Sequence, residues 1–120
     1  MTRESYDLRQ VVEQIIRFRD ERDWKQFHRP KELAAAIAIE AGELQELFLW
    51  RGEEHSDDLT EEPSRVESIA DELADVMIFT LLLSNELKIP VADAILAKLT
   101  KNAERYPIEK HKGIAKKSDL

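Results

Sequence analysis

The sequence predicts an all-α protein, a four-helix bundle that associates as a homo-oligomer. Glycine and proline are scarce, at 3 and 4 residues in 120, which is too few for the turns of an all-β fold. Apolar residues recur at helical spacing, and the 36% of charged residues suits amphipathic helices with solvated faces. Hydrophobic residues make up 42%, enough for the core of one small domain. Such a domain buries only part of its apolar surface, which favours dimerisation.

The first predicted helix covers residues 5–21 and carries one apolar stripe. The stripe consists of Leu8, Val11, Val12, Ile15, Ile16 and either Phe18 or Arg19. A short link over 22–29 follows it. The second helix is predicted over 30–50, because Pro30 suits a first turn and Gly52 is placed to end a helix. Residues 33–39 are apolar on every face, which predicts burial on more than one side.

The third helix is predicted over 63–87, after a polar and acidic loop, with Pro63 in its first turn. Residues 76–83 are again apolar all round, so one side can face the core and the other a partner subunit. The fourth helix starts at Pro90, has Asp93 in its first turn and ends before Pro107. We therefore predict a domain over 1–107 and a basic, flexible tail over 108–120.

The bulk properties exclude several classes of function. A formal net charge of -7 argues against a sequence-independent grip on nucleic acid and against attraction to an anionic membrane. The chain has no cysteine, which excludes disulfides and zinc-thiolate sites. The N-terminus has no apolar signal segment, and the longest apolar runs are far shorter than the roughly 20 residues that span a bilayer. We therefore expect a cytoplasmic protein.

Two pairs of acids interrupt the most apolar parts of the chain. Glu40 and Glu43 follow an unbroken apolar run, and Glu72 and Asp75 lead directly into another. A spacing of three residues places both acids of a pair on one helical face. Like charges at this spacing repel, and buried carboxylates need a counter-charge that no Lys or Arg within either motif supplies.

A divalent cation would supply that counter-charge. Four carboxylates without His or Cys form an all-oxygen ligand set, which favours Mg²⁺, with Mn²⁺ as the alternative, over zinc or copper. A lone Glu-x-x-Glu pair is usually a solvated helix face, and the neighbouring Glu46 and Asp71 favour that interpretation here. The spacing alone leaves both interpretations open. No Glu-x-x-His pair, phosphate-binding glycine loop or Cys nucleophile offers another chemistry.

The ordered set of motifs resembles a known family. Glu40-x-x-Glu43, 28 further residues and Glu72-x-x-Asp75 are similar to the acidic motifs of the MazG-like all-α nucleotide pyrophosphohydrolases, and most of all to the short dCTP pyrophosphatase type. The similarity spans residues 5–118. Its other segments are Arg22-Asp23-Trp24, Gln26-Phe27-His28, Glu46-Leu47-Phe48, Trp50 and Arg105-Tyr106-Pro107.

This resemblance implies hydrolysis of a nucleoside triphosphate to the monophosphate and pyrophosphate, as in nucleotide-pool sanitation. It implies Mg²⁺ held by the four acids, which are then also the catalytic residues, and a homodimer or homotetramer. It also implies a set of substrate-binding residues. Trp24, Trp50 and Phe79 are implied for the base, with Phe27 as either pocket or core and His28 as either a substrate contact or a structural histidine. Lys98, Asn102 and Arg105 are implied for the phosphates and sugar, with an exposed helix charge as the alternative for Lys98 and Arg105.

Two positions depart from the cytosine-specific members that the chain resembles. Those members carry a His where Ile15 stands and a Tyr where Phe79 stands. Each change removes a hydrogen-bonding group from the expected pocket, which can relax selection of the base. The expected substrate is therefore dCTP or a modified or other dNTP. The alternative from another class is a non-catalytic helical dimerisation or interaction module, with the acids binding a basic partner.

Overall fold

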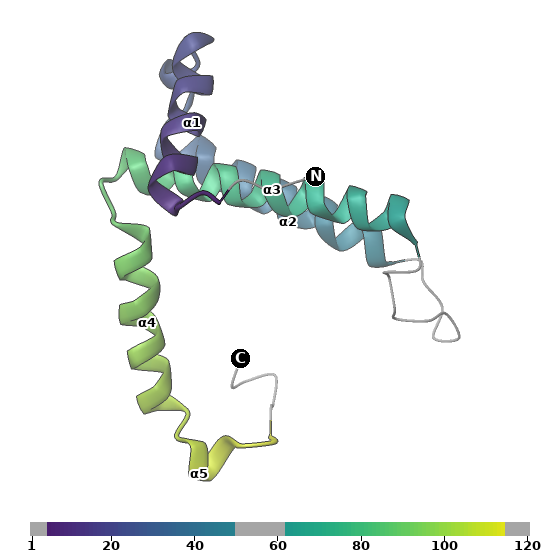
Figure 1. The fold of residues 1–120 in the computed structure, drawn as a ribbon, viewed down its shortest axis with the longest axis vertical. Helices are drawn as coiled ribbons and strands as arrows, with labels where there is room; N and C mark the ends of the chain where they lie inside the picture. The colour runs from purple at the N-terminus through teal and green to yellow at the C-terminus, as the bar shows by residue number, and fades with distance from the viewer. Residues whose placement is uncertain (1–4, 50–61, 115–120) are drawn as a thin grey trace. The chain divides into compact units, whose positions relative to one another are not determined.

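The computed structural model describes residues 5–49 and 62–114, and every regular element in these ranges is helical. The all-α prediction is confirmed for this part of the chain. Figure 1 shows the helices in order along the chain. They are α1 (Leu8–Glu21), the short 3-10 helix η1 (Lys25–Phe27), α2 (Pro30–Leu49), α3 (Pro63–Glu86), α4 (Val91–Arg105) and α5 (Ile108–His111). They form two compact units, Met1–Lys88 and Ile89–Leu120.

Helix α1 begins at Leu8, three residues later than the sequence predicts, because Asp7 caps it. The backbone N–H of Gln10 donates to the Asp7 carboxylate at 2.8 Å, and the backbone N–H of Asp7 donates to the Gln10 side chain at 2.9 Å. This reciprocal pair satisfies two N–H groups that a helix start leaves open. The apolar stripe shows which face of a helix is buried. It does not show which polar residue caps the start of the helix.

Helices α2 and α3 form the centre of the first unit. They run side by side as a hairpin and make the most extensive interhelical contact among the described residues. The guanidinium of Arg65, in the first turn of α3, donates a hydrogen bond to the carbonyl oxygen of Leu47 near the end of α2. This bond joins the two ends of the hairpin across the segment that connects them. The predicted bounds of both helices agree with the structure to within one residue where the chain is described.

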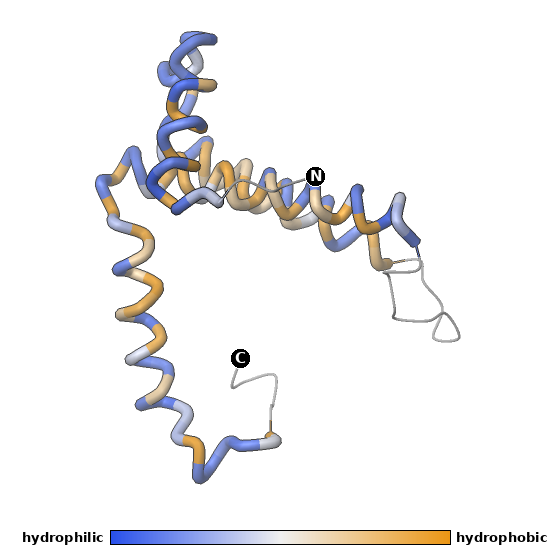
Figure 2. The backbone as a smooth tube through the Cα atoms, in the orientation of Figure 1, coloured by the Kyte–Doolittle hydropathy of each residue, from blue (hydrophilic) through white to orange (hydrophobic). Residues whose placement is uncertain are grey.

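The core of the first unit lies among α1, α2 and α3. Its fully buried apolar side chains are Leu33, Leu81 and Leu82. Both apolar runs leave part of their surface exposed in the described part of the first unit, since Ile39 and Met77 are exposed. Figure 2 shows the long apolar stretches of α2 and α3, and the alternation of apolar and polar residues along α1 and α4.

The second unit contains α4 and α5. Asp93 in the first turn of α4 and Arg105 in its last turn each complement the helix dipole. The sequence predicts a flexible tail from Ile108 onward, whereas Ile108–His111 form a short helix after Pro107. The rings of Tyr106 and His111 contact edge to face, with 5.3 Å between their centroids, and this contact stabilises the short helix. Residues 115–120 lie outside the described range.

Within residues 5–49 and 62–114, no helix is both long enough and apolar enough to cross a bilayer.

Candidate metal centre and adjoining pocket

Three of the four predicted acids converge between α2 and α3. One carboxylate oxygen each of Glu40, Glu43 and Glu72 lies within 4.8 Å of the other two. Glu40 and Glu72 are half-buried and Glu43 is exposed. The hairpin register brings them together. Counting outward from the bond between Leu47 and Arg65, Glu40 and Glu72 each lie seven residues, or two helical turns, further along their helices.

The electrostatics of this acid cluster reflect crowding of like charges. The pKa of Glu40 is raised above the ordinary glutamate value of 4.5, first by a hydrogen bond with the Glu72 carboxyl and then by burial. The charges of Glu72 and Asp75 raise it further. The pKa of Glu43 is raised by its hydrogen bond with Glu40 and by the Glu40 charge. Glu40 and Glu43 therefore hold protons more tightly than isolated carboxyls do.

The cluster also has buried oxygens that other groups leave unsatisfied. The Oε2 atoms of Glu40 and Glu72 are inaccessible to water and accept no hydrogen bond from the described residues. Burying a carboxylate oxygen without a partner costs folding free energy. A hard divalent cation is the partner that a set of oxygen ligands binds best. These residues therefore fit a divalent metal, as their sequence pattern predicts.

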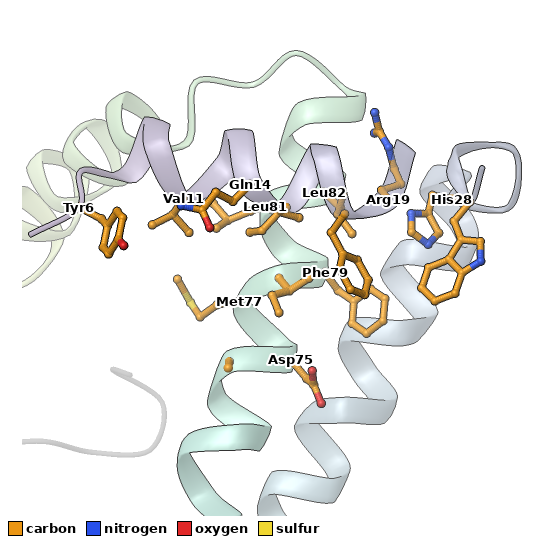
Figure 3. A pocket seen from close by; sticks show the side chains of 15 residues that line it. Tyr6, Val11, Gln14, Arg19, His28, Asp75, Met77, Phe79, Leu81 and Leu82 are labelled. Carbon is orange, nitrogen blue, oxygen red and sulfur yellow. The ribbon is translucent and has the colours of Figure 1, made fainter. Parts of the chain in front are cut away.

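A pocket adjoins the acid cluster and runs between α1 and α3. Its volume is about 760 Å³ and its walls are mainly apolar. Figure 3 shows it with Asp75 on one side and His28 on another. Asp75, the fourth predicted acid, both lines this pocket and acts electrostatically on Glu40. A molecule in the pocket would therefore lie beside the acid cluster.

Three of the predicted base-binding residues line this pocket, namely Trp24, His28 and Phe79. Ile15, the first of the two departures from the cytosine-specific pattern, lines it as well. The Nδ1 atom of His28 is buried and has no hydrogen-bond partner in the described part of the chain. It is thus available to a ligand. Phe27 is 63% exposed and lines neither the pocket nor the core.

The other predicted site residues belong to the second unit or lie outside the described residues. Lys98 and Asn102 share one face of α4 and line a shallow depression there. Arg105 ends α4, and its guanidinium carbon lies 5.4 Å from the centroid of the Tyr106 ring. All three of these residues belong to the second unit. Trp50 lies outside the described residues.

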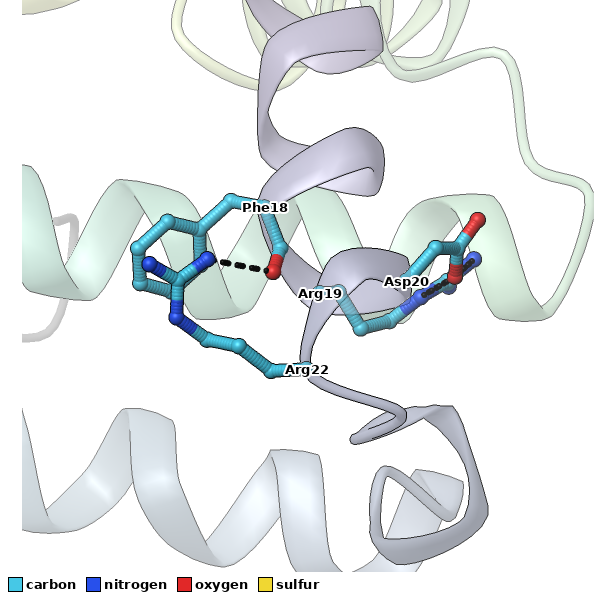
Figure 4. A network of polar contacts seen from close by, with 4 residues as sticks. All are labelled: Phe18, Arg19, Asp20 and Arg22. Atoms are coloured by element: carbon cyan, nitrogen blue, oxygen red, sulfur yellow. Dashed lines mark hydrogen bonds and ion pairs between the residues drawn. The ribbon is translucent and has the colours of Figure 1, made fainter.

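Some pocket residues were not assigned to the site from the sequence. Gln14, Phe18 and Arg19 on α1 line it, together with Met77, Ile78, Leu81 and Leu82 on α3. Phe18 stands three residues after Ile15, and this helical spacing is the signal that could have identified it. Arg19 takes the buried stripe position that the sequence left open between Phe18 and Arg19. Its side chain pairs with Asp20 at 2.8 Å (Figure 4).

A family model decides the relationship of this chain to known proteins. The model of the MazG-like family matches residues 35–120, which include both acidic motifs and all of α3 and α4. The chain belongs to the MazG-like family. The resemblance inferred from the paired acidic motifs is thereby confirmed.

Curated relatives of this MazG-like chain carry the name dCTP pyrophosphatase 1. The cattle protein is 35% identical over 121 residues, which cover 97% of this chain and 72% of the relative. The rat protein is 36% identical over 86% of this chain, and the match covers 61% of the relative. The human protein is 37% identical over 75% of this chain, and the match covers 53% of the human protein. The MazG-like chain thus spans between about half and three quarters of these relatives.

A solved structure shows the same fold. The crystal structure of a pyrophosphatase from Archaeoglobus fulgidus superposes with a TM-score of 0.70 at 33% sequence identity. The match covers 89% of this MazG-like chain and 98% of the archaeal chain.

Proposed function

We propose that this protein is a Mg²⁺-dependent nucleoside triphosphate pyrophosphohydrolase, which cleaves a (d)NTP to the (d)NMP and pyrophosphate. The observation that carries the proposal is the convergence of Glu40, Glu43 and Glu72 beside a pocket large enough for a base. Membership of the MazG-like family and likeness to proteins named pyrophosphatases support a hydrolase of this class.

The metal site consists of Glu40, Glu43, Glu72 and Asp75. Its ligands are all oxygen atoms, which favours Mg²⁺, with Mn²⁺ as the alternative. When bound, the metal would supply the positive charge that neutralises negative charge on the triphosphate. A carboxylate that is not fully engaged by the metal orients the attacking water and accepts its proton.

The base of the nucleotide occupies the pocket between α1 and α3. Trp24 and Phe79 offer aromatic surfaces for stacking, and the buried Nδ1 of His28 offers a hydrogen bond. Trp50 contributes to the same base site. Lys98, Asn102 and Arg105 bind the phosphates and sugar. Lys98 and Asn102 share a face of α4, and Arg105 follows three residues after Asn102 on the same side.

The apolar lining makes the base selection broad. Ile15 and Phe79 both lie in the pocket and offer no hydrogen-bonding group to a base. Stacking and apolar contact are tolerant of base identity. We therefore propose dCTP, or a modified or other dNTP, as the substrate, and nucleotide-pool sanitation in the cytoplasm by a homo-oligomer as the role.

The deciding experiment measures pyrophosphate release from a panel of common and modified NTPs and dNTPs, with Mg²⁺ and with chelator. We expect metal-dependent release, with a ranking of bases that reflects stacking more than hydrogen bonding. If folded protein with metal releases no pyrophosphate from any nucleotide, the enzymatic proposal is wrong. The non-catalytic interaction module would then be the better interpretation.

A further inference from the structure

Two aromatic side chains that line the pocket contact each other. Phe18 from the last turns of α1 and Trp24 from the turn after α1 both line it. Their rings meet edge to face, with centroids 5.7 Å apart and planes at 75°. The two rings thus act as one surface, which we call the aromatic wall.

The core does not hold the aromatic wall in place. Phe18 is 50% exposed and Trp24 is 43% exposed. An aromatic side chain with half its surface in water keeps more than one rotamer within reach, and its freedom opposes the binding of a ligand. Some other contact must restrict these rings if they are to present a fixed surface.

Arg22 makes that contact from behind the wall. Its guanidinium carbon lies 3.7 Å from the centroid of the Phe18 ring and 5.9 Å from that of the Trp24 ring, both within the range of a cation–π attraction. Nη1 of Arg22 also donates to the carbonyl oxygen of Phe18 at 3.0 Å, as Figure 4 shows. Arg22 is not among the residues that line the pocket, so it contacts the Phe18 ring without itself lining the pocket.

The backbone delivers Arg22 and Trp24 to these positions. Arg22 follows α1 as its C-cap. Asp23 then takes the left-handed conformation with φ of 54°, which reverses the chain. The N–H of Trp24 then donates back to the carbonyl of Arg19 at 3.1 Å. The side chain of Gln26 donates to the backbone carbonyl and the carboxylate of Asp23, at 3.0 and 3.1 Å. The turn is therefore held independently of the guanidinium.

We infer that Arg22 is a positioning residue that holds Phe18 and Trp24 as a stacking wall for the base of a bound nucleotide. Phe18 is thereby a second aromatic contact of the base, beside Trp24. The identity of the ligand rests on the proposed function. Because the wall contacts the base and supplies no carboxylate to the metal site, its loss weakens nucleotide binding and leaves the chemical step in place.

Steady-state kinetics of matched arginine variants test this inference. For Arg22→Ala we expect KM for the preferred dNTP to rise by about three- to tenfold, from the loss of two cation–π contacts and one hydrogen bond, while kcat stays within about twofold. Arg22→Lys, which keeps the cation, should restore part of the loss. Arg17→Ala is the control, since Arg17 is exposed on the same helix and does not line the pocket. Equal KM values for the Arg22→Ala and Arg17→Ala proteins, or a loss confined to kcat, would overturn the inference.

A binding measurement separates this inference from the enzymatic proposal. The protein is labelled with 5-fluorotryptophan, and the ¹⁹F signal of Trp24 is assigned by its absence in Trp24→Phe. We expect Arg22→Ala to shift the Trp24 signal in the free protein, and the signal in the unsubstituted protein to titrate with the non-hydrolysable α,β-imido analogue of dCTP in the presence of Mg²⁺. The dissociation constant should rise in Arg22→Ala by the same factor as KM.

The outcomes distinguish the two proposals. Analogue binding without any turnover of nucleotides would contradict the pyrophosphohydrolase, and the ratio of dissociation constants would then decide the role of Arg22 alone. A Trp24 signal that the analogue does not move would overturn the aromatic wall, whatever the turnover. A double-mutant cycle adds a further check. Arg22→Ala should cost little in a Phe18→Leu background, and full additivity would contradict the coupling.

Discussion

Glu40 has two neighbours that decide its behaviour. Glu43 shares its helical face one turn away, and Glu72 reaches it from α3, so three carboxylate oxygens come within 4.8 Å of one another. Crowding raises the pKa of Glu40 and Glu43, and two buried oxygens accept no hydrogen bond from the described residues. Protons or a cation must offset this repulsion. Two predictions follow at the scale of single residues.

Replacing Glu72 by Gln should remove both metal binding and turnover. The amide keeps the shape of the side chain and loses its charge, so we expect pyrophosphate release to fall by at least about a hundredfold. The rise in melting temperature on adding Mg²⁺ should also disappear. The matched control is Asp71→Asn, on the adjacent exposed residue of α3. Full activity in Glu72→Gln would exclude this residue from the site.

The stability of the metal-free protein should fall as pH rises through the raised pKa values. Because folding raises the pKa of Glu40 above 4.5, the folded state binds protons more tightly than the unfolded state. The associated stability is fully present below pH 4.5 and is lost as pH rises above it. The free energy of unfolding of the native protein relative to Glu40→Gln, measured in chelator by urea titration, should therefore decrease from pH 4.5 towards neutrality. A difference that is constant with pH would contradict this prediction.

Helix ends and helix pairs decide the geometry at the next scale. The capping box of Asp7 and Gln10 sets where α1 begins, and the bond between Arg65 and Leu47 joins the ends of the α2–α3 hairpin. The acid cluster lies two turns from that bond along both helices. A shift of one helix by a single residue would rotate its acids by about 100° away from the other pair.

Loss of the Asp7 cap should destabilise α1 measurably. We expect Asp7→Ala to lower the free energy of unfolding by about 1 kcal/mol, because the N–H of Gln10 loses its acceptor. Asp7→Asn retains an acceptor at the same place and should recover most of the loss. Urea unfolding curves of the three proteins provide the comparison. An Asp7→Ala protein as stable as the original would show that the cap contributes nothing.

At the scale of the whole molecule, more large apolar side chains are exposed than are fully buried among the described residues. Only three large apolar side chains are fully buried in the described ranges, and none of those on α4 is. Exposed apolar residues on α4 include Ile95, Leu96 and Leu99. Contiguous apolar surface of this kind is normally covered by other protein. This is the physical basis for expecting a homo-oligomer.

Sedimentation should accordingly give a mass that is a multiple of the 13.9 kDa chain. If association and folding are coupled, the melting temperature should also rise with protein concentration. A monomer whose melting temperature is independent of concentration would contradict this prediction. It would remove the basis for expecting a homo-oligomer.

The sequence alone determined the local features of this protein. The spacing of apolar residues predicted each of the four long helices, because burial on a helix repeats every 3.6 residues. The pairs Glu40–Glu43 and Glu72–Asp75 were predictable as same-face acids for the same reason. The Asp7 cap and the short helix at Ile108–His111 escaped this pattern, since they depend on polar and ring contacts and not on periodicity.

Only the tertiary structure decided how these features combine. The convergence of Glu72 with Glu40 and Glu43 requires one register between α2 and α3, and that register depends on contacts between residues distant in sequence. The pocket likewise requires α1 to lie on α3, which brings Ile15, Phe18 and Phe79 to one cavity. Such contacts depend on how side chains of different elements fit together, and a periodic pattern within one element carries no information about that fit.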